Sequence, residues 1–377
     1  RVSKRYLKIY TILVLINQQR RLRSFIDASI SDEDLPFLKS KELNPHKFSP
    51  FRLALKSDLS IEVSCLQEWD EFDVENFYRE QDRVLTPFLS LETPVSHVQF
   101  YDKCILPWME EGLGQEGGYG MVTSVKIHPT SHGFHNVDQV KHGCKLFALK
   151  KMTSPKIKDF ENETKMLRMF SGHHHLIRLL MSFSWKGNNY LLFPWAEKDL
   201  EAYWSDKSPP YDALGERMDA GSMSWISKQI LGMTSALHSI HNPKQPASLD
   251  KADLRYGRHG DLKAENILWL KGLGCTGGRD GILVIGDLGI SAVHRVVSRS
   301  NQPNQKIPHT PDYRPPECDL EGGKISRAFD IWTLGCLFLE MVCWILGGPS
   351  LRTDFTTARE NVPYLGANYF TSIFFDI

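Results

Sequence analysis

Two short polar stretches separated by a pair of apolar runs most strongly constrain how this chain can fold. The first stretch is His259-Gly-Asp-Leu-Lys-Ala-Glu-Asn266, and the second is Asp287-Leu-Gly289. Between them, Ile267–Leu270 and Ile282–Ile285 have the length and composition of β-strands, and a glycine-rich segment joins them. This pattern predicts a β-hairpin that leads the chain from the first polar stretch into Asp287.

The polar residues in these stretches suit phosphoryl transfer from a magnesium nucleotide. That reaction needs a carboxylate to orient the attacking hydroxyl group and oxygen ligands to hold the metal. Asp261 fits the first role, whereas Asn266 and Asp287 fit the second. Lys263 can offset the charge on the transferred group.

The first stretch resembles the catalytic loop of protein kinases, and other motifs of the chain follow the kinase order over residues 113–346. Phrases such as Asp34-Leu-Pro-Phe37 in the extension and Tyr256-Gly-Arg-His259 before the catalytic loop resemble a group of fungal Ser/Thr kinase-domain proteins that carry a helical extension. The ordered motifs are Gly114–Val122, Lys150, Glu163, His259–Asn266, Asp287–Gly289, His309–Glu317 and Asp330–Gly335.

Lys150 and Glu163 are predicted to form an ion pair. Lys150 ends an apolar strand, and its simplest alternative is a solvated strand end. The next segment has helical periodicity, which places Glu163 on the same face as Phe160, Leu167 and Phe170. A carboxylate on an inward face needs a cation, and the resemblance implies that this lysine binds the α- and β-phosphates. Glu161 points elsewhere and is the weaker candidate.

The resemblance also implies a nucleotide pocket. Pro194 lacks an N–H group, so the donors to adenine are expected at Trp195 or Ala196. The residues expected to enclose adenine are Val122, Ala148 and Leu268. Glycines let backbone N–H groups approach phosphates closely, although a plain hairpin is the alternative. The glycines concerned are Gly114, Gly117, Gly118 and Gly120.

Gly260 departs from the kinase pattern, because the family usually has an arginine there that binds a phosphorylated residue of the activation loop. We therefore expect activity without obligatory phosphorylation of Ser298 or Ser300. The resemblance further implies that Asp330 braces the catalytic-loop backbone. It also implies a buried stack, the regulatory spine, made of Leu167, Leu179, His259 and Leu288.

The predicted fold class is α+β, with a two-lobed kinase-like domain behind a mainly helical extension. Residues 1–107 form the extension, with a helix expected from about 4 to 26 and another over Val74–Leu85. Residues 108–377 form the kinase domain, divided into a β-rich N-lobe, 108–194, and a helical C-lobe, 195–377. The C-lobe is expected to be incomplete, which would leave Glu317 without its usual arginine.

Composition narrows the functional classes. Lys+Arg and Asp+Glu are both 45, so no overall field favours nucleic acid or an anionic membrane. Seven cysteines without a CxxC pair argue against a disulfide framework or zinc site and favour the cytoplasm or nucleus. Ile331–Leu346 is apolar but contains Glu340, which favours a buried core helix over a membrane segment.

Three functions are compatible with these motifs. The first is an ATP- and Mg²⁺-dependent Ser/Thr protein kinase, since lysine two positions after Asp261 resembles the Ser/Thr pattern. The second is a pseudokinase that binds nucleotide and acts as a scaffold through its N-terminal helices. The third is a small-molecule phosphotransferase, which His309–Glu317 disfavours because that segment resembles one that docks peptides. The expected partners are a protein substrate and a regulatory protein bound by the extension.

Overall fold

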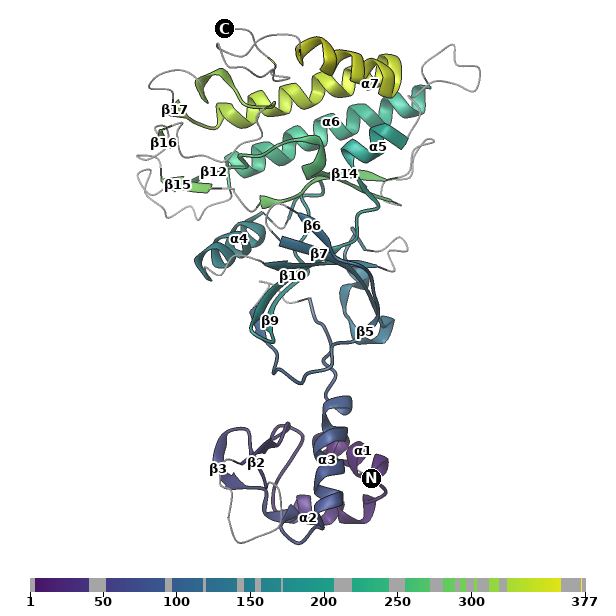
Figure 1. Cartoon of the computed structure of the whole chain (residues 1–377), viewed down its shortest axis with the longest axis vertical. Helices are drawn as coiled ribbons and strands as arrows, with labels where there is room; N and C mark the ends of the chain where they lie inside the picture. The colour runs from purple at the N-terminus through teal and green to yellow at the C-terminus, as the bar shows by residue number, and fades with distance from the viewer. Residues whose placement is uncertain are drawn as a thin grey trace.

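The computed structural model shows a small N-terminal body joined by a narrow connection to a larger body (Figure 1). The hydrophobic cluster of the smaller body includes residues from Tyr6 to Leu85, whereas Leu89 already pairs with His132 and is buried in the core of the larger body. The residues described by the structure are 4–40, 52–91, 97–117, 120–140, 146–152, 157–170, 172–206, 219–243, 255–271, 281–288, 292–295, 302–303, 312–318, 324–360 and 374.

The N-terminal body combines helices with a small antiparallel sheet. Its helices are α1 (Leu7–Leu15), α2 (Leu22–Asp27) and α3 (Glu71–Val84), and the sheet has the order β1 (Leu38–Lys39), β2 (Leu53–Leu55), β3 (Asp58–Glu62). Short 3₁₀ turns occupy Lys4–Tyr6, Gln19–Arg21 and Ser64–Leu66. The core is aromatic and contains Phe25, Phe37, Trp69 and Phe77.

One expectation for this body needs correction, and one feature of it was not expected. The single helix expected from about 4 to 26 is broken, because Asn17 adopts a φ of 58° that ends α1. The three-stranded sheet was not expected, since its strands are short and their alternation is weak. The helix expected over Val74–Leu85 is confirmed as α3, whose first turn is capped by the Asp70 carboxylate, which accepts a hydrogen bond from Asp73 N at 2.8 Å.

The larger body begins with a seven-stranded sheet of order β4-β9-β10-β8-β7-β5, in which β6 pairs with β7. Among the described strands of this sheet, β4 and β9 pair in parallel and the other pairs are antiparallel. The strands are β4 (His97–Gln99), β5 (Trp108–Glu111), β6 (Gln115–Gly117), β7 (Gly120–Ile127), β8 (Phe147–Met152), β9 (Met181–Trp185) and β10 (Asn188–Pro194).

The boundary expected between residues 107 and 108 therefore falls inside the larger body, because β4 already belongs to its sheet. Helix α4 (Ile157–Met169) lies beside this sheet (Figure 1). The segment His173–Leu180 forms no strand and contributes a bridge between Leu176 and Ile285. Two short 3₁₀ turns follow β7, at Pro129–Ser131 and Phe134–Asn136.

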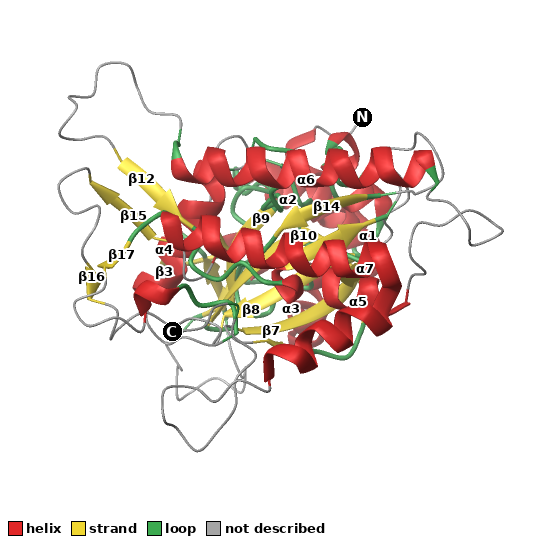
Figure 2. Cartoon of the chain, turned by 90° about the horizontal axis from the view of Figure 1, so that it is seen from above, coloured by secondary structure: helices red, strands yellow, loops and turns green. Residues whose placement is uncertain are grey.

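The remainder of the larger body is mainly helical. Helices α6 (Ala220–His241) and α7 (Ala328–Glu360) lie side by side in Figures 1 and 2, with α5 (Leu200–Asp206) next to them. The expected hairpin is confirmed as β13 (Ile267–Leu270) and β14 (Ile282–Ile285), with β11 (Lys198–Asp199) added at its edge. The remaining elements are β12 (Arg255–Arg258), β15 (Ala292–Arg295), β16 (Gln302–Pro303), β17 (Lys324–Ile325) and 3₁₀ turns at Ala264–Asn266 and Pro316–Cys318.

A sheet-rich lobe and a helical lobe thus make up the larger body, as the predicted α+β class requires. Among the described residues, α7 is long and apolar enough to cross a membrane by length and composition. It is kinked at Gly348, whose φ is 66°, and Pro349 follows the kink. Leu337 and Trp344 are fully buried in the core, so α7 is the core helix expected for this segment.

Candidate active site

The β13–β14 hairpin brings the two polar stretches together. Ile267 lies opposite Ile285 in the hairpin. The hydrogen-bonded ladder continues one step further, because Gly286 N donates to the carbonyl of Asn266 at 2.8 Å. Asp287 therefore leaves the hairpin next to the point where Asn266 enters it.

Asp261 lies within a small polar cluster. Asn266 Nδ2 donates to the Asp261 carbonyl at 2.8 Å and to its Oδ2 at 3.0 Å. Lys263 Nζ lies 3.3 Å from the same Oδ2. The Asp261 side chain is only 10% exposed, so its contacts fix the direction in which the carboxylate points. The cluster unites three residues expected at the site.

Lys150 forms an ion pair with Asp287. Its Nζ lies 3.1 Å from Asp287 Oδ1, and the lysine side chain is 11% exposed. Asp287 has a φ of 47°, a left-handed conformation that turns the chain directly after the strand. Glu163 lies in α4, but its side chain is outside the described residues, so the Lys150–Glu163 pair stays a prediction. Glu161 is exposed, as expected.

Asp330 braces the catalytic loop from the start of α7. Its fully buried carboxylate accepts hydrogen bonds from His259 N and Gly260 N, both at 2.8 Å. It also lies 2.8 Å from His241 Nε2, at the end of α6. The expected brace is confirmed, and it joins the loop to both long helices. The contribution of His241 was not predicted, because nothing in the sequence connects it with a residue so distant in the chain.

His259 connects the loop to the segment before Asp287. Its Nδ1 accepts a hydrogen bond from Asp261 N at 3.2 Å, which leaves Nε2–H to donate to the Gly286 carbonyl at 2.9 Å. The side chain is fully buried. The other residues of the expected spine are buried in one hydrophobic cluster and are Leu167, Leu179 and Leu288.

One face of the sheet is turned toward this site. Side chains alternate along a strand, so Ala148 and Lys150 lie on the opposite face of β8 from the buried Phe147 and Leu149. Val122 is paired with Lys150 and shares its face. Ala148 and Leu268 both pack at the edge of the same hydrophobic cluster. The residues expected to enclose adenine are therefore partly buried and belong to elements that border the site, as do Trp195 and Ala196 after β10.

The glycine-rich segment forms a hairpin in which Gly117 lies opposite Gly120. Gly118 is outside the described residues. A Cβ atom at Gly114 would lie 2.7 Å from Met121 Sδ, so the flexible Met121 side chain would have to move to admit one. The hairpin is compatible with phosphate binding through backbone N–H groups and also with a plain turn between two strands.

The oxygen-bearing side chains fit a magnesium ion that also binds nucleotide phosphates. Mg²⁺ usually takes one or two protein oxygen ligands and completes its shell with phosphates and water. Asn266 donates through its amide nitrogen, so its amide oxygen is the atom it can offer to a metal. Asp287 would supply a carboxylate oxygen. Among the described residues, no group of three His, Cys, Asp or Glu side chains could form a metal site without a nucleotide.

A second polar cluster, which was not predicted, lies against α7. Tyr313 OH donates to the buried Glu340 carboxylate, and Arg359 Nη2 lies 3.6 Å from the other carboxylate oxygen. Burial raises the pKa of Glu340, although Tyr313, Arg352 and Arg359 oppose the shift. Burial and the neighbouring Glu340 also raise the pKa of Tyr313. No regular spacing in the sequence connects these residues.

Glu317 is half-buried and has an interaction partner in the structure, so it is not isolated; the absence of its usual arginine stays a prediction. Ser298 and Ser300 lie outside the described residues, as does Thr310 in the segment before Tyr313. The expected role of loop phosphorylation therefore stays a prediction.

Comparison with known proteins gives one family match, to the protein kinase domain over residues 131–349. Serine/threonine-protein kinase crk1 of Schizosaccharomyces pombe is 29% identical over 61% of this chain and 52% of its own. Serine/threonine-protein kinase SSN3 of Candida glabrata is 28% identical over 51% of this chain and 29% of its own. Cyclin-dependent kinase D-1 of Oryza sativa subsp. indica is 27% identical over 68% of this chain and 48% of its own. The chain thus spans about half or less of the length of these relatives.

Proposed function

Because this chain belongs to the protein kinase domain family, we propose that it is an ATP- and Mg²⁺-dependent kinase that phosphorylates serine or threonine hydroxyls of proteins. The observation that carries the proposal is the cluster in which Asn266 and Lys263 both contact the Asp261 carboxylate, next to the Lys150–Asp287 pair. The names of the serine/threonine kinase relatives support the choice of acceptor.

In this proposal, Asp261 orients the acceptor hydroxyl and accepts its proton. The hydrogen bond from Asn266 Nδ2 fixes the carboxylate, and Lys263 lies close enough to stabilise charge on the transferred group. Lys150 would hold nucleotide phosphates, and Asn266 and Asp287 would hold Mg²⁺. When bound, Mg²⁺ supplies positive charge that offsets the charge developing on the phosphoryl oxygens.

The scaffold alternative draws on the N-terminal body, which folds around an aromatic core of its own. In that case the chain would bind nucleotide with little transfer, and the extension would hold a partner. An intracellular location, in the cytoplasm or nucleus, belongs to both versions of the proposal.

Transfer of radiolabelled γ-phosphate to a generic basic protein tests the proposal. We expect incorporation by the wild type and a loss on the order of 100-fold or more in Asp261→Asn, which keeps the shape of the side chain but removes the base. Asp27→Asn is a suitable control, because Asp27 is exposed in the N-terminal body, where it forms an ion pair with Arg23. ATP binding without transfer by the wild type would contradict the kinase proposal and favour the scaffold.

A further inference from the structure

The segment between the two bodies adds a strand to the sheet of the larger body. Strand β4 pairs in parallel with β9, with His97 opposite Ser182 and Gln99 opposite Ser184. Phe100 continues the pairing, since its N–H donates to the Ser184 carbonyl at 2.9 Å. Its ring also lies edge-on to that of Phe183, with 5.2 Å between centroids. β4 is therefore fixed by backbone and side-chain contacts.

His97 extends from this strand to helix α4. Its ring lies edge-on to Phe160 of α4, with 5.1 Å between centroids. Its Nε2 lies 2.8 Å from Ser184 Oγ, and its Nδ1 lies 3.3 Å from Ser182 Oγ. Arg168, near the end of α4, donates to the same Ser182 hydroxyl at 3.2 Å. Strand β4 and helix α4 are thus joined by the ring contact between His97 and Phe160 and by the hydrogen bonds that His97 and Arg168 both make to Ser182.

Helix α4 is the element that carries Glu163, the expected partner of Lys150. Phe160 lies three residues before Glu163, which is about one helical turn, and is itself buried in the hydrophobic core next to the site. A shift of Phe160 along or around the helix axis would therefore also shift the backbone of Glu163. The contact at His97 is far from the reacting groups in sequence but is coupled to them through one rigid helix.

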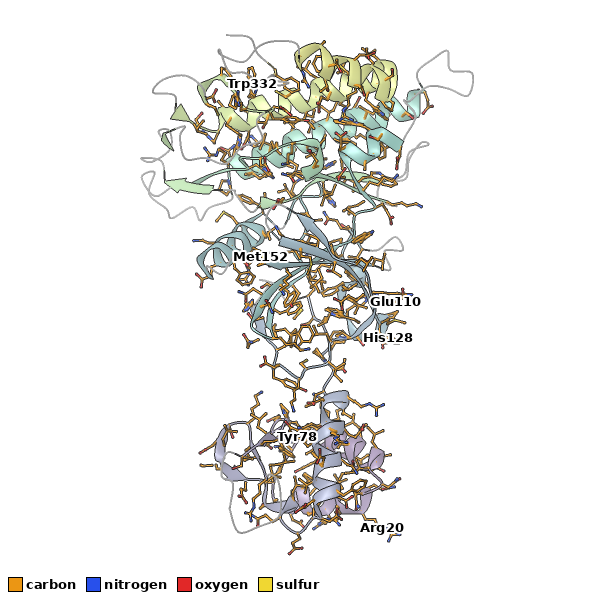
Figure 3. All side chains as sticks on the ribbon, viewed as in Figure 1. Arg20, Tyr78, Glu110, His128, Met152 and Trp332 are labelled. Atoms are coloured by element: carbon orange, nitrogen blue, oxygen red, sulfur yellow. The ribbon has the colours of Figure 1, made fainter. Side chains whose placement is uncertain are left out.

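The same segment is attached to the N-terminal body. Tyr101 OH donates to Asp82 Oδ1 of α3 at 3.1 Å, and Lys103 Nζ donates to Tyr78 OH at 2.5 Å. The lysine also lies over the Tyr78 ring, 4.3 Å from its centroid. Figure 3 shows Tyr78 at the end of the N-terminal body that faces the larger body. The contacts form a continuous connection from α3 through β4 to α4.

We propose that β4 is a positioning strand that holds α4 in place within the same chain, with His97 as the positioning residue. Through this strand, the N-terminal body sets the position of the helix that accompanies Lys150. A regulatory protein that bound the N-terminal body and moved α3 would thereby alter phosphate transfer. This role rests on the proposed kinase function, but the contact between strand and helix can be measured without activity.

His97→Ala in the full chain tests this role, with Gln99→Ala as the matched control. Gln99 is exposed on the same strand, and its side chain donates to the neighbouring Phe100 carbonyl rather than to α4. We expect amide hydrogen exchange over residues 157–170 to become about five times faster or more in His97→Ala and to stay unchanged in Gln99→Ala. We also expect a fall of about tenfold in kcat/KM for ATP, within the usual range of coupling between sites.

A conservative variant separates positioning from general stability. His97→Phe keeps the ring against Phe160, so it is expected to restore most of the exchange protection and of the kcat/KM lost in His97→Ala. Unchanged exchange in α4, or faster exchange without any change in kcat/KM, would overturn the proposal. If His97→Ala does not fold, Phe160→Leu weakens the same contact from the helix side and is expected to give the same pattern.

The kinase function and the positioning role can fail separately. A wild type without phosphate transfer would contradict the kinase function. In that case, amide hydrogen exchange over α4 and the Kd for Mg-ATP still test the positioning role. His97→Ala is expected to make the exchange faster and to weaken Mg-ATP binding about tenfold. No change in either quantity would overturn it.

Discussion

The Asp330 carboxylate holds Gly260 in a left-handed backbone conformation. Oδ1 of Asp330 accepts the Gly260 N–H at 2.8 Å, and the φ of Gly260 is 87°. A residue with a Cβ atom is disfavoured in this region by about 1–2 kcal/mol. Glycine therefore relieves backbone strain at a position where most kinases are expected to carry arginine. Glycine in place of arginine at position 260 therefore affects the backbone conformation of the loop as well as its expected regulation.

Gly260→Ala is expected to lower the free energy of unfolding by about 1–2 kcal/mol, because alanine cannot adopt this φ without strain. Urea denaturation measures the loss. Gly335→Ala is the control: Gly335 lies within α7, and a Cβ atom there would have no other atom within 4 Å. That variant should be neutral or stabilised by up to about 1 kcal/mol. Equal effects at the two positions would contradict the conformational argument.

Asp330→Asn is expected to cost on the order of 3 kcal/mol in stability and to reduce phosphate transfer. The amide loses the charge and cannot accept all of the hydrogen bonds that the buried carboxylate receives from His259, Gly260 and His241. Thermal denaturation and the phosphate-transfer assay measure the two effects.

Asp32→Asn is a matched control for Asp330→Asn. Asp32 also accepts two backbone N–H groups, from Lys8 and Ile9 at 2.9 Å each, but it lies in the N-terminal body. We expect a smaller loss of stability and unchanged transfer. A similar loss of transfer in both variants would show that Asp330 acts only through overall stability.

Asp287→Asn is expected to reduce kcat on the order of 100-fold and to raise the Mg²⁺ concentration needed for half-maximal transfer. The substitution removes a charged oxygen ligand and also weakens the ion pair with Lys150. A Mg²⁺ titration of phosphate transfer provides the measurement. Asp206→Asn serves as the control, because Asp206 forms its ion pair with Lys198 on an exposed surface. An unchanged Mg²⁺ dependence in Asp287→Asn would remove Asp287 from the metal site.

Glu340→Gln is expected to change how stability depends on pH. Burial raises the folded-state pKa of Glu340 above its ordinary value of 4.5, so the folded protein binds this proton more tightly than the unfolded protein. The resulting stabilisation is present below the unfolded pKa and is lost as the pH rises through the folded pKa. The stability of Glu340→Gln relative to wild type should therefore increase with pH across that interval.

Urea denaturation at a series of pH values above 4.5 tests the effect of Glu340→Gln. The exposed Glu161→Gln provides a control for the substitution of glutamate by glutamine. A flat difference for Glu340→Gln would mean that the Tyr313 and Arg359 contacts cancel the effect of burial.

The double substitution Ser298→Ala and Ser300→Ala is expected to leave phosphate transfer within about twofold of wild type. Gly260 cannot supply the charged side chain that would hold a phosphorylated residue. Transfer assays on protein treated with phosphatase provide a second measurement with the same expected result. Loss of turnover with ATP binding intact would contradict activity without loop phosphorylation.

Several elements could be predicted from the sequence because their determinants are local. The β13–β14 hairpin follows from two apolar runs around glycines, and α3 follows from apolar residues at helical spacing. The approach of Asn266 to Asp287 is a consequence of that hairpin. By contrast, the break at Asn17 and the short strands of the N-terminal body have weak local signals. Periodicity therefore predicted one continuous helix and did not predict the strands.

The sequence by itself determined the kinase family, the α+β class and the residue types of the site, because these depend on motif order and on patterns within single elements. Only the tertiary structure decided which distant groups meet. His241 reaches Asp330, Tyr313 reaches Glu340 and His97 reaches Phe160 only after helices and strands have packed. Such contacts depend on how elements are oriented in the core, and the free energy that fixes this orientation is spread over many side chains rather than encoded at any one spacing.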